Sequence, residues 1–220
     1  MPPDPTKSME LLTSPGQRQR IELSHARCRD LGMDARRAPN FSSPSAGQWR
    51  LVLERSESLR RLAVPVMTLL HRQIARARSM VILTDSAGCI LETVGDAQFL
   101  QQAEKVALSA GIDWSEAGKG TNAIGTALID KLPTLVHGEQ HFLQANHFLT
   151  CSAVPLWRPD GSIAGVLDVT GHQSSYLRHT MALIDLSATI IGNGLVVEAP
   201  GALVCLSFHA RPDLLSTPAQ

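Results

Sequence analysis

The chain has 220 residues, of which 44% are hydrophobic, and its 20 basic residues balance 20 acidic ones. This length and apolar fraction suffice for a domain with a buried core, and they exclude a chain that is disordered throughout. The zero net charge gives no electrostatic reason to expect direct binding of nucleic acid.

The four cysteines, Cys28, Cys89, Cys151 and Cys205, are scattered along the chain and form no CxxC pair. This spacing fits neither a disulfide framework nor a zinc site built from thiolates. The N-terminus has no signal-peptide pattern, and no uninterrupted apolar run approaches the roughly 18 residues of a membrane span. We therefore expect a cytoplasmic protein that does not enter a membrane.

The first third of the chain predicts helices joined by a linker. Residues 1–16 are rich in Pro, Ser and Thr and indicate a mobile tail. A helix with a glycine cap is predicted over residues 17–31, and Pro, Ser and Gly mark residues 34–47 as a linker. A longer helical period covers residues 51–78, and Pro65 is expected to kink that helix or split it in two.

Two hairpins are the clearest strand signals. Residues 80–83 and 89–94 flank the first turn, and residues 150–156 and 163–170 flank the second. Such short turns exclude a parallel crossover, so an antiparallel sheet is predicted. Weaker patterns predict helices over 97–108, 122–130, 139–145 and 176–191, and strands over 133–136 and 202–208. Together these elements predict an α+β fold, with a central antiparallel sheet flanked by helices.

A glycine-rich turn, Gly118-Lys119-Gly120-Thr121, superficially resembles a phosphate-binding loop. The spacing does not match, because the P-loop pattern G-x-x-x-x-G-K-[ST] places the lysine after the last glycine. Two interpretations stay open: a structural loop in which Thr121 caps the helix that starts at Asn122, or contact between free backbone amides and a small anion.

His137, His141, His147 and Cys151 are the side chains that a metal ion would choose in this region. His137 and His141 face the same way only if their segment is helical, which Gly138 makes doubtful. We therefore predict no metal site and no other cofactor. The imidazoles are expected to tie loops together over a pocket or to contact an organic ligand.

Three more side chains have competing interpretations. Cys151 is a catalytic nucleophile, a ligand-contacting or redox-sensitive thiol, or a small buried core residue. Asp168 alternates with Leu167 along an apolar strand, so it lies on a solvated sheet face or is hydrogen-bonded in a pocket. Trp114 is explained most simply by packing.

The region from Trp114 to His172 resembles the signal-sensing GAF domain of bacterial sigma-54-dependent activators of the acetoin and glycerol metabolism type. The motifs that carry the resemblance are Gly120-Thr-Asn-Ala-Ile-Gly-Thr-Ala-Leu128, Val136-His-Gly138, His141-Phe142, Thr150-Cys-Ser-Ala153, Pro159-Asp-Gly161 and Gly165-Val-Leu-Asp168. A weaker similarity covers about residues 20–215. The resemblance implies a GAF-like sensor domain over residues 48–195, preceded by the N-terminal helix and linker (17–47) and followed by a linker (196–220).

The resemblance also implies a function. A small-molecule effector would bind between the sheet and the segment 118–147, and the flanking helices would pair two subunits into a homodimer. The ligand-binding residues expected on this basis are Trp114, Gly120, Thr121, Asn122, His137, His141, Cys151 and Asp168, and no catalytic residue is expected. Activators of this type continue into an AAA+ ATPase and a helix-turn-helix, and no pattern for either is present in this sequence. Neither ATPase activity nor DNA binding is therefore expected of this chain.

Two other classes of function stay open. Some GAF domains reduce free methionine sulfoxide, and Cys151 with Cys89 as its resolving partner would be the candidates for that chemistry. The third alternative is a dimerisation module that binds no ligand.

Overall fold

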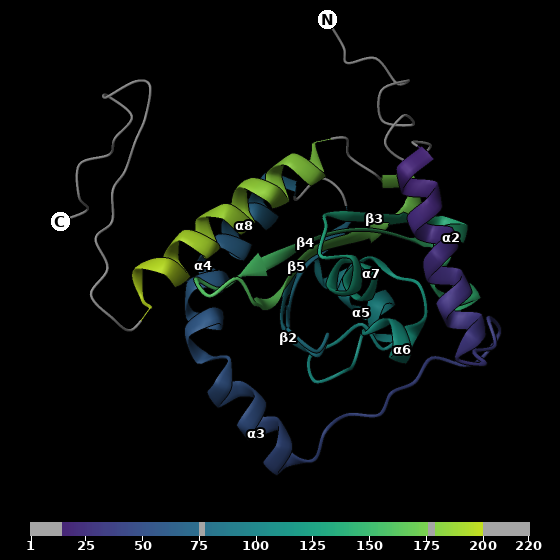
Figure 1. Ribbon diagram of the computed structural model, residues 1–220, viewed down its shortest axis with the longest axis horizontal. Coiled ribbons are helices and arrows are strands. Elements are labelled where there is room, and N and C mark those ends of the chain that lie inside the picture. Colours follow the sequence, from purple (N-terminus) through teal and green to yellow (C-terminus); the bar gives the residue numbers. More distant parts are fainter. Residues whose placement is uncertain (1–14, 75–77, 176–178, 200–220) are drawn as a thin grey trace, which may run out of the picture.

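The computed structural model describes residues 15–74, 78–175 and 179–199 (Figure 1). Its centre is a five-stranded antiparallel sheet in the order β2-β1-β5-β4-β3. The strands are β1 (Ser79–Asp85), β2 (Ile90–Gly95), β3 (Thr134–His137), β4 (Leu149–Trp157) and β5 (Ile163–His172). The sheet and the helices around it confirm the predicted α+β fold, including both hairpins.

Helices cover both faces of the sheet, because successive strand residues alternate between two apolar clusters. On one face α4 (Glu57–Ile74) and α8 (Thr180–Val197) pack over Leu167 and Val169. On the other face α5 (Ala97–Glu104) and α7 (Ala123–Asp130) lie over the cluster that contains Val166. The short α6 (Glu116–Lys119) precedes α7, and α3 (Ala46–Arg55) precedes α4.

The N-terminal helix α2 (Pro15–Asp30) docks at the β3 edge of the sheet and against α6 (Figure 1). It has no apolar stripe, and most of its buried residues are polar or small: Gln17, Ile21, Ser24 and Cys28. Gln17 donates through its amide to the Leu135 carbonyl, and His25 pairs with the Gln140 carbonyl at 2.9 Å. Hydrogen bonds therefore hold α2 in place more than hydrophobic contact does.

The long helix predicted over residues 51–78 is interrupted, but not where the proline indicated. The break lies at Ser56, which separates α3 from α4 and has a ψ angle of 7° outside the helical range. Pro65 lies inside α4 without ending it. The helix predicted over 97–108 also ends early, at Glu104, because Ala107 takes a positive φ of 59° that stops helical hydrogen bonding.

Three further predictions were wrong in detail. Residues 139–145 form no continuous helix but two 3-10 turns, η1 (Gly138–Gln140) and η2 (Gln144–Asn146), because Gly138 takes a positive φ. The cap of α7 is Asn122, whose side chain accepts from the Gly125 amide, while the Thr121 hydroxyl bonds elsewhere. Helix α8 does not end near Gly192 and Gly194 but runs through both to Val197. At Gly194 the absence of a side chain leaves room for Leu62 of α4. The start of that helix as predicted, most of the 1–16 tail and the 202–208 strand lie outside the described residues.

Helix α8 is the one described helix long and apolar enough to cross a membrane by length and composition alone. The apolar core helix of a folded domain passes the same test. Ile184, Ala188 and Ile191 are buried on the face that packs against the sheet and α4. The opposite face carries exposed apolar side chains, among them Leu186 and Ile190.

Candidate functional site

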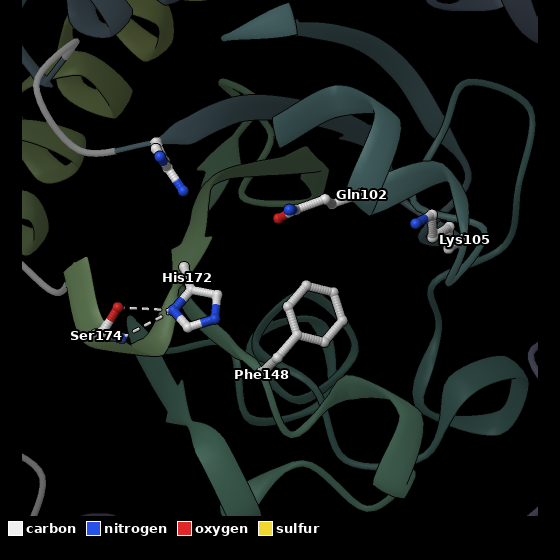
Figure 2. A pocket seen from close by; sticks show the side chains of 6 residues that line it. Gln102, Lys105, Phe148, His172 and Ser174 are labelled. Carbon is white, nitrogen blue, oxygen red and sulfur yellow. Dashed lines mark hydrogen bonds between the residues drawn. The ribbon is translucent and has the colours of Figure 1, made fainter. Parts of the chain in front are cut away.

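A cavity of about 580 Å³ opens at one end of the sheet, between the strand ends and the C-terminal end of α5 (Figure 2). We call it the sheet-end pocket, and its lining residues are Arg78, Gln102, Lys105, Phe148, His172 and Ser174. Its volume is in the range of pockets that hold metabolite-sized ligands.

Strand register explains why residues so far apart in sequence meet here. In the ladder between β1 and β5, Ser79 lies opposite Gly171, which places Arg78 beside the end of β5 at His172. In the ladder between β4 and β5, Leu149 lies opposite His172, so Phe148 also borders this end. Helix α5 contributes the remaining wall through Gln102, while Lys105 follows its last turn.

The orientation of His172 is fixed by Ser174 of η3 (Gln173–Ser175). The Ser174 backbone N–H donates to Nδ1 of His172 at 3.3 Å, and the Ser174 hydroxyl lies 2.8 Å from the same nitrogen. On its other side the ring faces Phe148, with ring centroids 6.2 Å apart and planes inclined by 44°. Figure 2 shows the imidazole standing between Ser174 and Phe148 at the pocket wall.

The glycine-rich turn predicted to contact ligand is a tightly bonded structural corner. Gly120 ends α6 with a φ of 69°, and its carbonyl accepts from the Asn122 side chain at 2.8 Å. The Thr121 hydroxyl lies 2.7 Å from the Ser24 hydroxyl of α2. The buried Trp114 donates its indole N–H to the Ala107 carbonyl at 2.8 Å. These bonds use the side chains of Trp114, Thr121 and Asn122 within the fold.

The two predicted histidines lie near each other around η1. His141 is buried and its Nδ1 pairs with the Gly138 carbonyl at 3.0 Å. Burial lowers the pKa of His141 to about 4 and also lowers the pKa of His137, which keeps both rings neutral at physiological pH. Neutral imidazoles that tie loops together are one of the two outcomes expected from the sequence.

Cys151 and Asp168 meet on neighbouring strands beneath α7. Thr170 of β5 donates to the Asp168 carboxyl at 2.5 Å and lies 3.1 Å from the Cys151 sulfur. Burial raises the pKa of Asp168 to about 7, and burial with the nearby Asp168 raises the pKa of the Cys151 thiol well above its usual range. The solvated position considered for Asp168 is wrong, because α7 covers this face of the sheet.

None of the eight predicted residues is among those that line the sheet-end pocket. Sequence reasoning missed all six pocket residues because no motif contains them. The sequence does hold one indication of this pocket, which is position: Arg78, Phe148 and His172 lie next to the predicted beginnings or ends of strands. Knowledge of the strand register would have brought these three together.

The cysteine geometry does not suit a thiol-dependent reductase. Cys151 lies on β4 and Cys89 directly precedes β2, with β1 and β5 between these strands. Three strand spacings amount to roughly 14 Å, whereas disulfide-bonded Cα atoms are at most about 7 Å apart. Burial also raises the pKa of Cys89 to about 11, which leaves little thiolate at neutral pH.

For metal binding, the described ranges contain no group of three His, Cys, Asp or Glu side chains that is placed to hold an ion. His137 and His141, four residues apart, are not on a helix, so their spacing does not bring them together on one helical face. The chemistry available at the sheet-end pocket is that of hydrogen bonding, charge and an aromatic wall.

Comparisons with known proteins agree with this fold. A family model described as MimR, N-terminal domain, matches residues 53–189. The acetoin dehydrogenase operon transcriptional activator AcoR of Bacillus subtilis (strain 168) is 38% identical over 108 residues, which are 49% of this chain and 18% of the relative. The acetoin catabolism regulatory protein of Cupriavidus necator is 30% identical over 164 residues, 74% of this chain and 25% of the relative.

Among solved structures, the chain is similar to one in the E. coli DhaR(N)-DhaL complex, with a TM-score of 0.77 and 23% identity. The match covers 80% of this chain and 60% of the solved one, and it shows a shared fold. The chain thus spans a quarter or less of the length of the two curated relatives named above.

Proposed function

Because the chain belongs to the family of the MimR N-terminal domain, we propose that it is the signal-receiving module of a bacterial transcriptional activator and binds a small-molecule effector in the sheet-end pocket. The named relatives are transcriptional regulators of acetoin utilisation. This supports a regulatory role, rather than an enzymatic one, and a cytoplasmic location.

The observation that carries the proposal is the position of the pocket at the end of the sheet, a few residues along the chain from the ends of the two flanking helices. Arg78 follows the last residue of α4 by four positions, and Ser174 precedes the first residue of α8 by six. Helices α4 and α8 also pack against each other on the far face of the sheet. A ligand that draws the pocket walls together would favour one arrangement of this helix pair, provided that it binds that arrangement more tightly.

A thermal-shift screen tests effector binding on the whole chain. The panel contains hydroxy-ketones, diols and carbonyl compounds, as the acetoin-type relatives suggest, together with small organic acids. A ligand present at a hundred times its Kd stabilises the folded state by about 2.7 kcal/mol, which raises the Tm by several degrees. If no compound raises the Tm at millimolar concentration, the proposed effector-binding function is wrong.

We further propose that α8 pairs two copies of the chain. Leu186, Ile190 and Val197 are 60%, 48% and 71% exposed and follow one another along one side of the helix. Water-exposed apolar stripes of this kind mark surfaces that another protein covers. A homodimer through α8 would place this helix beside α8 of the second subunit. A ligand-induced shift of α8 in one subunit would then be transmitted to the other.

A protein effector is the second candidate for the signal. It is favoured by the solved relative, whose structure is that of a complex between DhaR(N) and DhaL. This alternative predicts that purified DhaL forms a complex with the chain in a sedimentation experiment. Absence of a complex together with a Tm shift from a small compound would favour the first candidate.

A further inference from the structure

The sheet-end pocket concentrates positive charge in a chain whose net charge is zero. Arg78 and Lys105 line it, and the lining residues that the structure describes include no Asp or Glu. Within the described ranges, neither cation makes a side-chain hydrogen bond or an ion pair with another residue. By contrast, Arg27, Arg60 and Arg61 all have carboxylate partners. The two pocket cations are therefore available to an anion from solution.

His172 adds a hydrogen-bond donor at the same end of the sheet as Arg78. A backbone N–H can only donate, so the bond from the Ser174 amide makes Nδ1 of His172 an acceptor. In the neutral ring the proton then lies on Nε2, the nitrogen turned away from Ser174 (Figure 2). Arg78 and the Nε2–H of His172 come from the adjoining ends of β1 and β5.

The remaining walls indicate an organic ligand rather than a bare inorganic ion. The Phe148 ring provides an apolar surface beside His172, and the Gln102 amide can donate or accept (Figure 2). A cavity of about 580 Å³ is larger than a single small ion requires. The combination suits a molecule with a charged end and a short carbon skeleton.

We propose that the sheet-end pocket binds a small organic carboxylate, whose carboxylate pairs with Arg78 and the Nε2–H of His172 while its carbon skeleton packs on Phe148. The planar guanidinium offers paired N–H donors that match a carboxylate, and charged hydrogen bonds are about twice as strong as neutral ones. Lys105 adds positive potential without having to touch the ligand. This inference rests on the proposed effector-binding function and specifies the class of effector, in contrast to neutral diols and hydroxy-ketones.

Isothermal titration of the whole chain tests the class of ligand with pairs that differ only in charge. The probes are propionate, succinate and benzoate, each compared with its neutral amide at 50 mM salt. We expect at least one carboxylate to bind about tenfold or more tightly than its amide, and its affinity to fall as salt screens the charges. The Arg78→Gln variant should lose about tenfold in affinity for that carboxylate.

Arg50→Gln is the matched control, because Arg50 is exposed on α3, outside the pocket, and its loss changes the net charge equally. The melting curve of each variant shows whether it is folded. If an amide binds as tightly as its carboxylate, or if Arg78→Gln binds like Arg50→Gln, the carboxylate inference is wrong. A diol or hydroxy-ketone that still raises the Tm would then leave the effector-binding function standing, whereas no binding by any compound overturns both.

Discussion

Arg27 of α2 makes a bidentate ion pair with Glu116 of α6, with its Nε 2.5 Å from Oε1 and its Nη2 2.9 Å from Oε2. Ser24, one helical turn earlier, donates to the same carboxylate at 2.5 Å. Thr126 of α7 also contacts this carboxylate, at 3.2 Å. One buried acidic side chain thus joins the N-terminal helix to the part of the domain that carries the family-like glycine-rich turn.

The first prediction concerns this ion pair. Arg27→Ala leaves the Glu116 carboxylate, whose side chain is 2% exposed, without its charged partner. Because Arg27 is itself 34% exposed and solvent screens the pair, we expect a loss of about 1–2 kcal/mol in the free energy of unfolding, less than for a fully buried pair. Urea denaturation measures this loss. Arg29→Ala, at an exposed position on the same helix, is the control, and equal losses in the two variants would contradict the role of the pair.

The second prediction separates backbone strain from crowding at Gly120. Both Gly120 and Gly161 have positive φ, at 69° and 81°. An added Cβ at Gly120 would lie 2.8 Å from Cβ of Phe142, whereas nothing lies within 4 Å of one at Gly161. Gly161→Ala should therefore destabilise the protein by about 1 kcal/mol through strain alone, and Gly120→Ala by roughly 2–4 kcal/mol. Equal shifts in the urea midpoint would show that Phe142 moves aside freely.

The third prediction is a pH dependence that comes from Asp168. Its pKa is about 7 in the folded protein, against 3.8 for an unperturbed carboxyl. The folded state therefore holds a proton that the unfolded chain releases, and this contribution to stability is lost as the pH rises from about 4 to 7. Asp168→Asn removes the titration, so the variant should gain stability relative to the wild type by roughly 2–4 kcal/mol between pH 4 and pH 8. Parallel stability profiles of the two proteins would rule out a buried, protonated Asp168.

Asp168 also illustrates how far the sequence alone leads. Alternation correctly placed it on the sheet face opposite Leu167, because strand side chains alternate strictly. Whether that face is exposed to solvent depends on where α7 packs, which is a long-range property that no local pattern encodes. The strands and most helices were predictable because local patterns encode them. The break at Ser56 and the unbroken path of α8 through Gly194 were not predicted from such patterns.

The candidate site shows the same limit more strongly. The predicted residues were chosen for chemical type within one segment, and the fold uses most of them for capping, loop anchoring and core packing. The sheet-end pocket instead takes residues from four segments of the chain, from Arg78 to Ser174. Only the antiparallel register brings Arg78, Phe148 and His172 to one end of the sheet.

The fourth prediction tests the proposed homodimer. Leu186→Glu introduces a charge into the exposed stripe of α8 and should shift the chain from dimer to monomer in sedimentation velocity, with little change in Tm at a residue that is 60% exposed. Ile129→Glu on α7, at a position 49% exposed, is the matched control and should leave the assembly intact. A wild-type chain that is monomeric at all concentrations would exclude pairing through α8.

The most direct measurement of effector binding in the sheet-end pocket is an NMR titration of the isotopically labelled chain with a compound that raises its Tm. We predict that the largest amide shifts occur at Gln102, Lys105, Phe148, His172 and Ser174, which line the pocket. Smaller shifts should follow in α4 and α8, whose ends lie within six residues of Arg78 and Ser174 along the chain. Shifts centred instead on residues 114–122, His141 and Cys151 would place the ligand in the segment that the sequence indicated and would contradict binding at the end of the sheet.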